Sequence, residues 1–475
     1  MTGSQAALER IDDCLSVRDG HLFVEECDAV ELARSFGTPL YVMSENQLRR
    51  NARRLSRAFS DRWAGPVRLL PSIKANNVLA VRRVLTDAGL GCDTFGLAEL
   101  EAALSCPVPP EAISVNGGGK SAALVERAVG AGCRLTLDAA RELDLVVDAV
   151  ERTGRPARIR LRVRPDLSAL GALATDFSPE GTSIAEASRR YKAGMPLDDV
   201  VRTGERALRT DGVELTGIHA HFARHTVRLD AWAVMLGALG DLVGELSARW
   251  GGWRPTEIDA GGGIPTPRDP TGRAIPQVDA VRGEVPSFEA FAEVIASALA
   301  EGLARHGLRP DETTLEIEPG RACYADAGVH LSTVTNVKRE ARPLPPLTFV
   351  ELDTSEVFLL DVHLEHTRWS ARVANKMTRP DELSCDLVGA SCGFDTIVPD
   401  VTIPEAEPGD VVAFLDTGAY QEVCANNFNA MGRPATVLVT GADARVVRRA
   451  ETLEDVFARD VPPALHQTPT KGDRA

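Results

Sequence analysis

The stretch Val67-Arg68-Leu69-Leu70-Pro71-Ser72-Ile73-Lys74 is a short apolar run that ends in a lysine. Similar runs follow it, separated by segments such as 98–104 and 139–150, which carry apolar residues at helical spacing. They lie at Gly91–Phe95, Ile113–Gly117, Arg134–Asp138, Arg158–Val163, Leu215–Phe222, Glu257–Gly261 and Thr314–Glu318. Strand and helix alternating about eight times over roughly 250 residues predicts the α/β class and a (β/α)8 TIM-like barrel. A doubly wound parallel sheet alternates in the same way, so it remains the alternative.

The polar residues that carry chemistry stand at or just beyond the ends of these runs. They are Lys74, Asp93, Asn116, His221, the triplet Gly261-Gly262-Gly263 and the sequence Glu318-Pro319-Gly320-Arg321. Active sites of (β/α)8 barrels are assembled at the carboxyl ends of the strands. This placement favours the barrel over the open sheet.

The rhythm of the sequence changes after Arg321. The runs 329–338, 347–353, 387–390, 411–415 and 436–439 read as strands without regular helices between them. We therefore expect two domains, a barrel over residues 43–320 and a β-rich domain made of residues 1–42 and 321–475. Two segments are expected to be loose, the Pro-, Gly- and charge-rich stretch 265–286 and the tail from about residue 467.

The composition is that of a soluble globular protein, with 44% hydrophobic and 25% charged residues among 475. A net charge of -15 argues against nucleic acid or an anionic membrane as a partner. Nine cysteines are scattered without a CxxC pair, so we expect neither a disulfide framework nor a metal site. The N-terminus lacks an apolar signal region, and no segment approaches the length of a membrane span. A cytoplasmic enzyme is therefore expected.

Lys74 is the residue on which the functional interpretation depends. A lysine amine titrates near about 10.4 in water, and an apolar strand end is a poor place for its ammonium form. Such a place suits an amine that loses its proton and forms a Schiff base with a carbonyl. A surface lysine whose charged head reaches solvent is the ordinary alternative. Residues further along the chain argue against that alternative, because together they fit pyridoxal phosphate (PLP).

One group of these residues fits the phosphate. Gly261-Gly262-Gly263 follows a strand-like run, and without side chains its backbone N–H groups can surround an anion. A plain glycine turn is the commoner meaning of such a triplet. Arg321 and Tyr420 would add a charged donor and a hydroxyl donor.

A second group fits the ring. Glu318 would keep the pyridine nitrogen protonated, which makes the ring a strong electron sink. An ion pair between Glu318 and Arg321 is the structural alternative. His221 offers a flat imidazole that can stack on the ring face, whereas His219 is interpreted as a satisfied core histidine.

The order of these motifs resembles that of the alanine-racemase-fold (fold type III) PLP-dependent decarboxylases, which include the diaminopimelate, ornithine and biosynthetic arginine decarboxylases. The shared order is Lys-Ala-Asn, Gly-x-His-x-His, Gly-Gly-Gly, Glu-Pro-Gly-Arg, a late Cys and Asp-x-Gly-Ala-Tyr, and it extends from about residue 22 to residue 439. Further matching pieces lie at 116–121, 407–410 and 427–429. Each motif is weak alone, but the ordered set is specific.

The resemblance implies a role for each residue. Lys74 would carry PLP as a Schiff base, His221 would stack on its ring, and Glu318 would pair with the pyridine nitrogen. Asp93 would bind the cofactor and, with Glu99, line the early face of the barrel. The phosphate would be held by the remaining group, which is Gly261, Gly262, Gly263, Arg321 and Tyr420.

The resemblance also implies a shared active site. Cys392, in Ala390-Ser391-Cys392, matches the cysteine of the family that crosses a dimer interface and acts as the acid toward the α-carbon. Lys74, His221, Glu318 and Cys392 are therefore the expected catalytic residues, with either Cys392 or Lys74 returning the proton. A homodimer is the implied minimum assembly. From composition alone, Cys392 would be an ordinary buried thiol.

The chain departs from the family near the expected substrate. Ala223-Arg224 replaces the usual Gly-Ser after the second histidine, and Arg164 replaces a common asparagine. Cys392-Gly393-Phe394-Asp395 lacks the acid that usually follows the cysteine, although Asp395 would substitute for it in a loop one residue shorter.

The distal end of the substrate is affected most. In diaminopimelate decarboxylases an Arg-Pro-x-Leu-Tyr motif grips this end, and by counting Asp361 stands at the arginine and Glu365 at the tyrosine. A carboxylate in place of a cation should invert the charge preference there. Arg224, Asp361, Glu365 and Asp395 are thus the candidate substrate-binding residues.

From these patterns we expect a PLP-dependent carboxy-lyase that removes the α-carboxylate of an amino acid or amino-acid conjugate. The altered distal residues point to a specialised, siderophore- or antibiotic-like pathway, with a carrier protein as a possible partner, and away from diaminopimelate. The alternatives are a diaminopimelate decarboxylase proper, a PLP-dependent racemase or epimerase, and a non-catalytic relative. Racemases that resemble this group place an arginine beside the pyridine nitrogen, so Glu318 favours decarboxylation.

Overall fold

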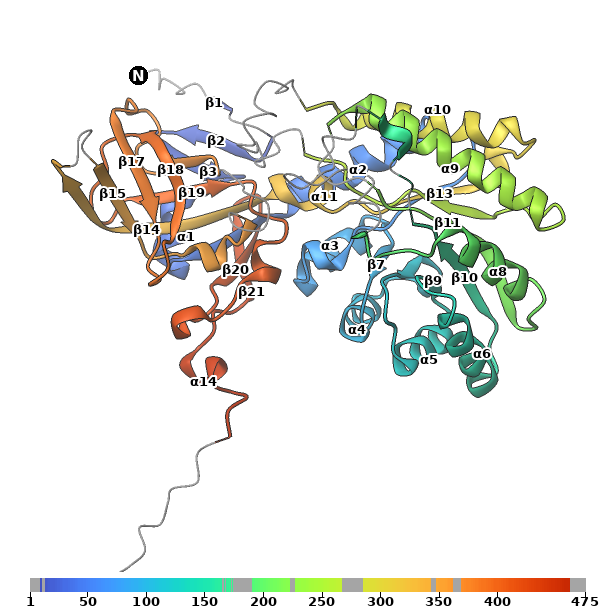
Figure 1. Cartoon of the computed structure of the whole chain (residues 1–475). Helices are drawn as coiled ribbons and strands as arrows, with labels where there is room; N and C mark the ends of the chain where they lie inside the picture. Colours follow the sequence, from blue (N-terminus) through green and yellow to red (C-terminus); the bar gives the residue numbers. More distant parts are fainter. Residues whose placement is uncertain are drawn as a thin grey trace, which may run out of the picture.

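The computed structural model describes residues 9–10, 13–164, 166, 168–171, 173, 190–222, 227–266, 285–342, 347–361 and 369–461. The chain forms two lobes, a barrel ringed by helices and a β-rich lobe (Figure 1). The segments predicted to be loose lie outside the described residues, apart from residues 265, 266, 285 and 286.

The barrel is built from parallel strands in one eight-stranded sheet, in the order β6-β13-β12-β11-β10-β9-β8-β7. Main-chain contacts connect its two ends, because Gly91 N donates to Leu69 O at 2.9 Å and Ser72 forms a parallel bridge with Asp93. This nearly closed sheet confirms the predicted (β/α)8 barrel and excludes the doubly wound alternative. The strands are β6 (Val67–Leu69), β7 (Cys92–Thr94), β8 (Ile113–Val115), β9 (Arg134–Leu137), β10 (Ala157–Arg162), β11 (Val213–His219), β12 (Glu257–Asp259) and β13 (Thr314–Ile317).

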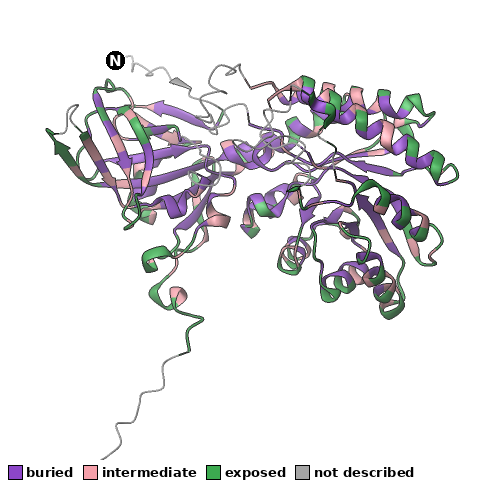
Figure 2. Ribbon diagram, viewed as in Figure 1, coloured by how far each residue is buried: buried purple, intermediate pink, exposed green. Residues whose placement is uncertain are grey.

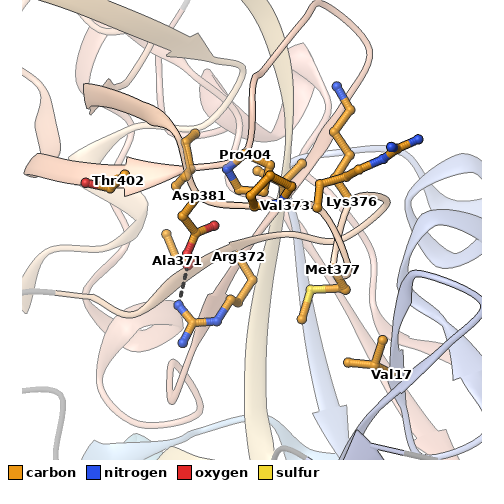
Figure 3. A pocket seen from close by; sticks show the side chains of 12 residues that line it. Val17, Ala371, Arg372, Val373, Lys376, Met377, Asp381, Thr402 and Pro404 are labelled. Atoms are coloured by element: carbon orange, nitrogen blue, oxygen red, sulfur yellow. Dashed lines mark hydrogen bonds between the residues drawn. The ribbon is translucent and has the colours of Figure 1, made fainter. Parts of the chain in front are cut away.

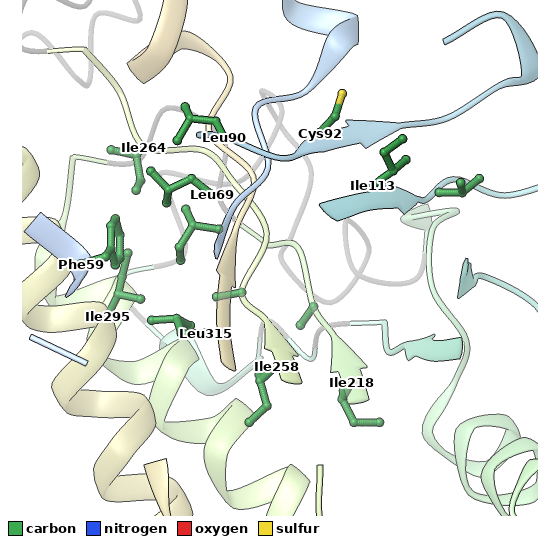
Figure 4. Packing of buried hydrophobic residues seen from close by; sticks show 14 of the residues in the cluster. Phe59, Leu69, Leu90, Cys92, Ile113, Ile218, Ile258, Ile264, Ile295 and Leu315 are labelled. Atoms are coloured by element: carbon green, nitrogen blue, oxygen red, sulfur yellow. The ribbon is translucent and has the colours of Figure 1, made fainter. Parts of the chain in front are cut away.

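Helices cover the outside of the barrel and turn their buried faces toward it (Figure 2). Serine side chains begin several of them: the hydroxyl of Ser44, Ser121 or Ser287 accepts a backbone N–H of the first turn. Apolar side chains of the helices and strands then pack into one core, part of which is drawn in Figure 4. The helices are α2 (Glu45–Ser60), α3 (Leu79–Asp87), α4 (Leu97–Ser105), α5 (Ala122–Ala131), α6 (Glu142–Thr153), α8 (Leu197–Ala207), α9 (Leu229–Arg249) and α10 (Phe288–Arg305).

Charged side chains occupy part of the barrel interior. Glu316 on β13 accepts hydrogen bonds from Arg68 on β6, Arg134 on β9 and Arg160 on β10. Because β9 and β10 are not neighbours of β13 in the sheet, these contacts cross the inside of the barrel. Arg134 also binds Glu257 at 2.9 Å, so opposite charges are paired in a region from which water is excluded.

The β-rich lobe confirms the predicted second domain. Its main sheet has nine strands in the order β18-β17-β15-β14-β5-β20-β21, with β19 pairing with β14 and β16 pairing with β19. These strands are β5 (Leu40–Ser44), β14 (Gly328–Glu340), β15 (Leu347–Leu352), β16 (Ala371–Val373), β17 (Leu383–Val388), β18 (Thr396–Ile403), β19 (Val411–Leu415), β20 (Ala435–Thr440) and β21 (Asp443–Arg448). A smaller sheet contains β1 (Glu9–Arg10), β2 (Leu15–Arg18), β3 (His21–Val24) and β4 (Cys27–Asp28), followed by α1 (Ala29–Phe36). Short helices α11 (Arg321–Tyr324), α13 (Gln421–Cys424) and α14 (Leu453–Val456) complete the lobe.

Strand β5 bears on the predicted domain boundary. It lies between β14 and β20 in the sheet of the β-rich lobe, and it ends at Ser44. A division at residue 43 would therefore cut this strand, and a boundary just after Ser44 agrees better with the sheet. The barrel strands themselves lie between residues 67 and 317.

Helix α9 corrects the expectation that no segment approaches the length of a membrane span. Its 21 residues are long and apolar enough to cross a membrane by length and composition, and 56% of its most apolar window is buried inside the protein. It packs against α10, where Gly240 and Gly302 allow the two backbones to approach closely. A core helix of a folded domain has the same properties.

Candidate active site

Lys74 lies in a 3-10 turn (η1, Ile73–Ala75) just beyond β6, at the carboxyl end of the barrel. Its Nζ is 3.7 Å from Asp93 Oδ2 and 4.6 Å from the centre of the Phe95 ring. The Lys74 side chain is 41% exposed, whereas that of Asp93 is fully buried. The lysine thus stands at the mouth of the barrel beside a buried carboxylate.

This environment differs from the apolar strand end expected from the sequence. Burial lowers the pKa of Lys74, but its interactions with Asp93, Tyr420 and Glu318 outweigh burial and leave the pKa above its ordinary value. The structure therefore stabilises the ammonium. The ammonium must lose this proton to a base before the free amine can attack a carbonyl.

The second lobe holds the turn that carries Lys74. Asn76 Nδ2 donates to Gly418 O at 2.9 Å, and Tyr420 N donates to Ala75 O at 2.7 Å. Tyr420 has a φ of 69°, a left-handed conformation that a non-glycine residue adopts only when its surroundings hold it there. Both lobes therefore contribute to the site.

Glu318 follows β13 and is buried, with 5% exposure. Its Oε1 accepts a hydrogen bond from Asn116 Nδ2, and the same nitrogen donates to Asp93 Oδ1 at 2.6 Å. Burial, followed by the nearby charge of Asp93, raises the pKa of Glu318. The Glu318–Arg321 ion pair considered from the sequence is replaced by these contacts.

The two histidines have different surroundings. His219 is buried, and burial lowers its pKa to about 3, so it is neutral at pH 7. It was expected to be a satisfied core histidine, but neither ring nitrogen has a hydrogen-bond partner among the described residues. His221 lies at the mouth with its side chain 27% exposed, and its Nδ1 accepts the N–H of Gly262 at 3.0 Å.

His219, Asp259 and Glu318 present donor atoms within 4.8 Å of one another, a spacing that can suit a metal ion. Arg160 Nη1 lies 2.9 Å from Asp259 Oδ2. A guanidinium already supplies positive charge to this group, which argues against a cation there.

The glycine triplet packs closely against the neighbouring strand ends, as a run of residues without side chains allows. A Cβ at Gly262 would lie 2.1 Å from Glu318 O, and a Cβ at Gly261 would lie 2.7 Å from His221 Nδ1. However, the N–H of Gly261 donates to Asp259 Oδ1 at 2.9 Å and that of Gly262 to His221. The role of this triplet in holding a phosphate therefore stays a prediction.

Arg321 begins α11 and is buried beside the mouth. Its Nη2 donates to Asp361 Oδ2 at 2.5 Å, and its guanidinium carbon lies 4.9 Å from the centre of the Tyr420 ring. Asp361 is itself 2% exposed. Two predicted site residues of opposite charge, one assigned to the phosphate and one to the substrate, thus bind each other.

Cys392 is exposed, unlike the buried thiol that composition alone suggests, and it lies on a tightly held loop. Its N–H donates to Asn429 Oδ1 at 2.9 Å. The Asp395 carboxylate accepts the N–H groups of Glu356 and Ser391, each at 2.6 Å, and Asp395 is only 2% exposed. Asp395 therefore shapes the loop, and its predicted contact with a substrate is not supported by this geometry.

Two candidate substrate-binding residues, Arg224 and Glu365, lie outside the described residues. A cavity of about 570 Å³ opens in the β-rich lobe, lined by residues such as Val17, Arg372 and Thr402 (Figure 3). None of the predicted site residues lines it.

Sequence reasoning missed the contacts that hold the carboxylates of Asp93 and Glu318. Asn116 was noted as a candidate just beyond a strand end and as part of a matching motif, but its hydrogen bonds to both carboxylates were not foreseen. Arg160 and Asp259 lie within strands that were interpreted as apolar, and alternation of charged and apolar residues in Arg158-Ile159-Arg160-Leu161-Arg162 was the available signal.

Comparison with known proteins decides the family. Residues 45–325 match the family model described as "Pyridoxal-dependent decarboxylase, pyridoxal binding domain". The chain belongs to the pyridoxal-dependent decarboxylase family. It is a PLP-dependent carboxy-lyase of the alanine-racemase fold, as its motifs predicted.

Relatives of this decarboxylase match over almost their whole length. Diaminopimelate decarboxylase of Archaeoglobus fulgidus is 30% identical over 448 residues, covering 94% of this chain and 98% of that protein. The enzyme of the same name from Pseudomonas aeruginosa is 30% identical over 453 residues, with coverage of 94% and 98%. The crystal structure of M. jannaschii diaminopimelate decarboxylase with L-lysine superposes with a TM-score of 0.84 at 26% identity, covering 95% and 98%.

The residues present fit PLP. Lys74 offers an amine at the mouth, Glu318 offers a buried carboxylate with one oxygen already occupied by Asn116, and His221 offers a partly exposed imidazole whose Nδ1 lies 4.0 Å from Glu318 Oε2. These groups would suit the aldehyde, the ring nitrogen and the ring face of the cofactor, in that order.

Proposed function

We propose that this decarboxylase removes the α-carboxylate of a diamino acid of the diaminopimelate class. The support is the likeness to diaminopimelate decarboxylases over nearly the full length of both chains. One observation carries the chemistry: Lys74 and Glu318 are linked through Asp93 and the single amide of Asn116. This arrangement suits a cofactor whose two reactive ends need a charged group each.

In this proposal each side chain performs one task. Lys74 would hold PLP through its aldehyde carbon and would give way to the amine of the substrate. Glu318 would hold a proton at the ring nitrogen, and His221 would cover one face of the ring. When bound, PLP takes up the electron pair released as carbon dioxide leaves.

The remaining roles concern the phosphate of the cofactor and the assembly of two protomers. Arg321, Tyr420 and the glycine triplet would hold the phosphate. Cys392, exposed on its loop, would enter the site of a second protomer and return a proton to the α-carbon, so a homodimer with shared sites is part of the proposal. The exposure of Cys392 and of the adjacent Phe394, which is 100% exposed, is consistent with such a loop.

A specific observation favours a second candidate. Asp361 neutralises Arg321 at 2.5 Å, with both side chains buried, so a distal anion would meet a pair without net charge. This neutral pair fits an amino acid or amino-acid conjugate whose distal group is not an anion. Such a substrate would belong to a specialised pathway and could be free or bound to a carrier protein. Racemisation has no comparable support, because the residue expected beside the ring nitrogen is the carboxylate Glu318 and not an arginine.

The test is release of carbon dioxide by purified protein reconstituted with PLP. We expect meso-diaminopimelate to be decarboxylated, and the Lys74→Ala variant to lose both the visible absorbance band and the product of borohydride reduction. Lys338→Ala is the matched control, because Lys338 is an exposed lysine of the β-rich lobe and should leave both unchanged. Release of carbon dioxide from lysine or a citryl conjugate, but not from diaminopimelate, would favour the second candidate. Epimerisation of an amino acid without release of carbon dioxide would contradict both candidate functions.

A further inference from the structure

The amide of Asn116 contacts both carboxylates of the candidate site. Its Nδ2 donates to Asp93 Oδ1 at 2.6 Å and to Glu318 Oε1, and Asn116 is 1% exposed. Asp93 Oδ2 in turn accepts from Ser72 Oγ at 2.6 Å and faces Lys74 Nζ at 3.7 Å. The Asn116 side chain therefore joins the carboxylate that faces Lys74 to the carboxylate of Glu318.

The direction of these hydrogen bonds follows from Arg160. A guanidinium only donates, and Arg160 Nη2 donates to Ser114 Oγ. The Ser114 hydroxyl is then left to donate its own hydrogen to Asn116 Oδ1, which lies 3.1 Å away. With its oxygen used as an acceptor, the Asn116 amide must turn both N–H groups toward the carboxylates. A flipped amide would place its oxygen against two negative charges.

Arg160 is itself held firmly. It is fully buried, donates to Glu316 and lies 2.9 Å from Asp259 Oδ2. Its Nε and Nη2 also donate to Thr136 Oγ1, at 3.2 and 3.0 Å. Strand β10 therefore fixes the orientation of an amide on the loop after β8.

We propose that Asn116 is a positioning residue, oriented by Arg160 through Ser114, that keeps Asp93 and Glu318 as hydrogen-bond acceptors at the two ends of the cofactor. Because Oε1 of Glu318 is occupied, Oε2 is the oxygen left to face the ring nitrogen of a bound cofactor, where it would hold that proton. Asp93 Oδ2 stays opposite the nitrogen of Lys74, 3.7 Å away. This inference rests on the proposed placement of PLP between Lys74 and Glu318.

The charged and titratable groups that face Lys74 come from every element packed around it. They are Asp93 on β7, Glu99 on α4, Arg162 on β10, Glu318 after β13 and Tyr420 before α13. Asn116 is the neutral residue that contacts two of them, so changing it alters the field at Lys74 without removing a charge.

The test is a pH titration of the visible absorbance of the PLP-loaded enzyme without substrate, which reports the proton on the nitrogen shared by Lys74 and the cofactor. Asn116→Ala removes a donor from Asp93, whose charge then attracts that proton more strongly. We expect the midpoint to rise by about one pH unit. Ser114→Ala should move it in the same direction by less, and the double variant by no more than Asn116→Ala alone, because the two act in series.

A second readout follows the ring. With 15N-labelled PLP, the resonance of the ring nitrogen should move toward its unprotonated position in Asn116→Ala, because Glu318 loses a donor and holds the proton itself. Thr136→Val is the matched control, since it removes the other hydroxyl partner of Arg160 without touching Asn116. Its titration should match the unmodified protein.

Several results would overturn the proposal. One is an unchanged midpoint of the absorbance titration in Asn116→Ala, with only a lower melting temperature. Another is a shift of that midpoint in Thr136→Val as large as in Asn116→Ala. The third is a shift in the double variant that equals the sum of the two single shifts. If Asn116→Ala does not fold, the titration of Ser114→Ala decides. Failure of the unmodified protein to bind PLP at Lys74 would instead refute the proposed function.

Discussion

The buried carboxylate of Glu316 offers the sharpest stability test. It is fully buried inside the barrel and accepts hydrogen bonds from Arg68, Arg134 and Arg160. Burial raises its pKa, but the three guanidiniums outweigh burial and leave the pKa below its ordinary value. Glu316→Gln keeps the volume and removes the charge.

The expected loss of stability in Glu316→Gln depends on the ion pairs that remain in the barrel. After the change, Arg134 keeps Glu257 at 2.9 Å and Arg160 keeps Asp259 at 2.9 Å, so neither cation is left without an opposite charge. Breaking a buried ion pair costs about 3–5 kcal/mol when a partner is stranded. Because Arg134 and Arg160 are not stranded here, we expect a cost at the lower end, about 3 kcal/mol.

Glu289→Gln is the matched control. Glu289 pairs with Arg54 on the surface, where the two side chains are 39% and 41% exposed. Solvent screens such a pair, and its loss costs less than about 1 kcal/mol. Urea unfolding followed by far-UV circular dichroism at pH 7 measures both midpoints. Equal midpoints for Glu316→Gln and Glu289→Gln would refute the reasoning.

Three further results are expected. Burial lowers the pKa of His330 to about 3, whereas the pKa of an unfolded histidine is 6.5. The contribution of neutral His330 to the free energy of unfolding is therefore complete above pH 6.5 and falls by ~1.4 kcal/mol per pH unit toward pH 3. In His330→Gln, the urea midpoint should fall less steeply between pH 6 and pH 4. Cys392 is the exposed cysteine and should react with a thiol reagent faster than the other cysteines. If a second protomer covers Cys392, dilution of the protein should increase its labelling rate. A labelling rate that does not depend on dilution would contradict the shared site. Asp361→Asn should remove a carboxylate from the expected distal subsite and raise decarboxylation of diaminopimelate relative to lysine about tenfold; an unchanged ratio argues that Asp361 lies away from the substrate.

The sequence predicted the barrel because each of its strands is a local pattern. All eight apolar runs became barrel strands, from Val67–Leu69 to Thr314–Ile317. The later lobe was predicted less completely, since strands β16, β18 and β21 were missed. β18 contains Pro399 and exposed polar residues, and the exposed β21 carries alternating charges, so neither shows a continuous apolar run.

The site was predicted in its residue types but not in its contacts. Lys74, Glu318 and His221 stand where their motifs placed them, at the carboxyl end of the barrel. The pairing of Arg321 with Asp361 joins residues that are 40 positions apart in the chain, and the contact of Asn116 with Glu318 joins strand ends that are not neighbours in the barrel. Such long-range contacts depend on how strands are arranged in space, which local spacing does not encode.

Strand β5 has a consequence for synthesis of the protein. Leu40–Ser44 is among the first segments to leave the ribosome, yet both of its partners come late, β14 at Gly328–Glu340 and β20 at Ala435–Thr440. All residues of the barrel strands are therefore available before the central strand of the other sheet can pair on either side. An emerging chain carries an unpaired β5 throughout this interval. A stop at residue 434 would remove β20 and leave that edge open permanently, a site at which chains can associate.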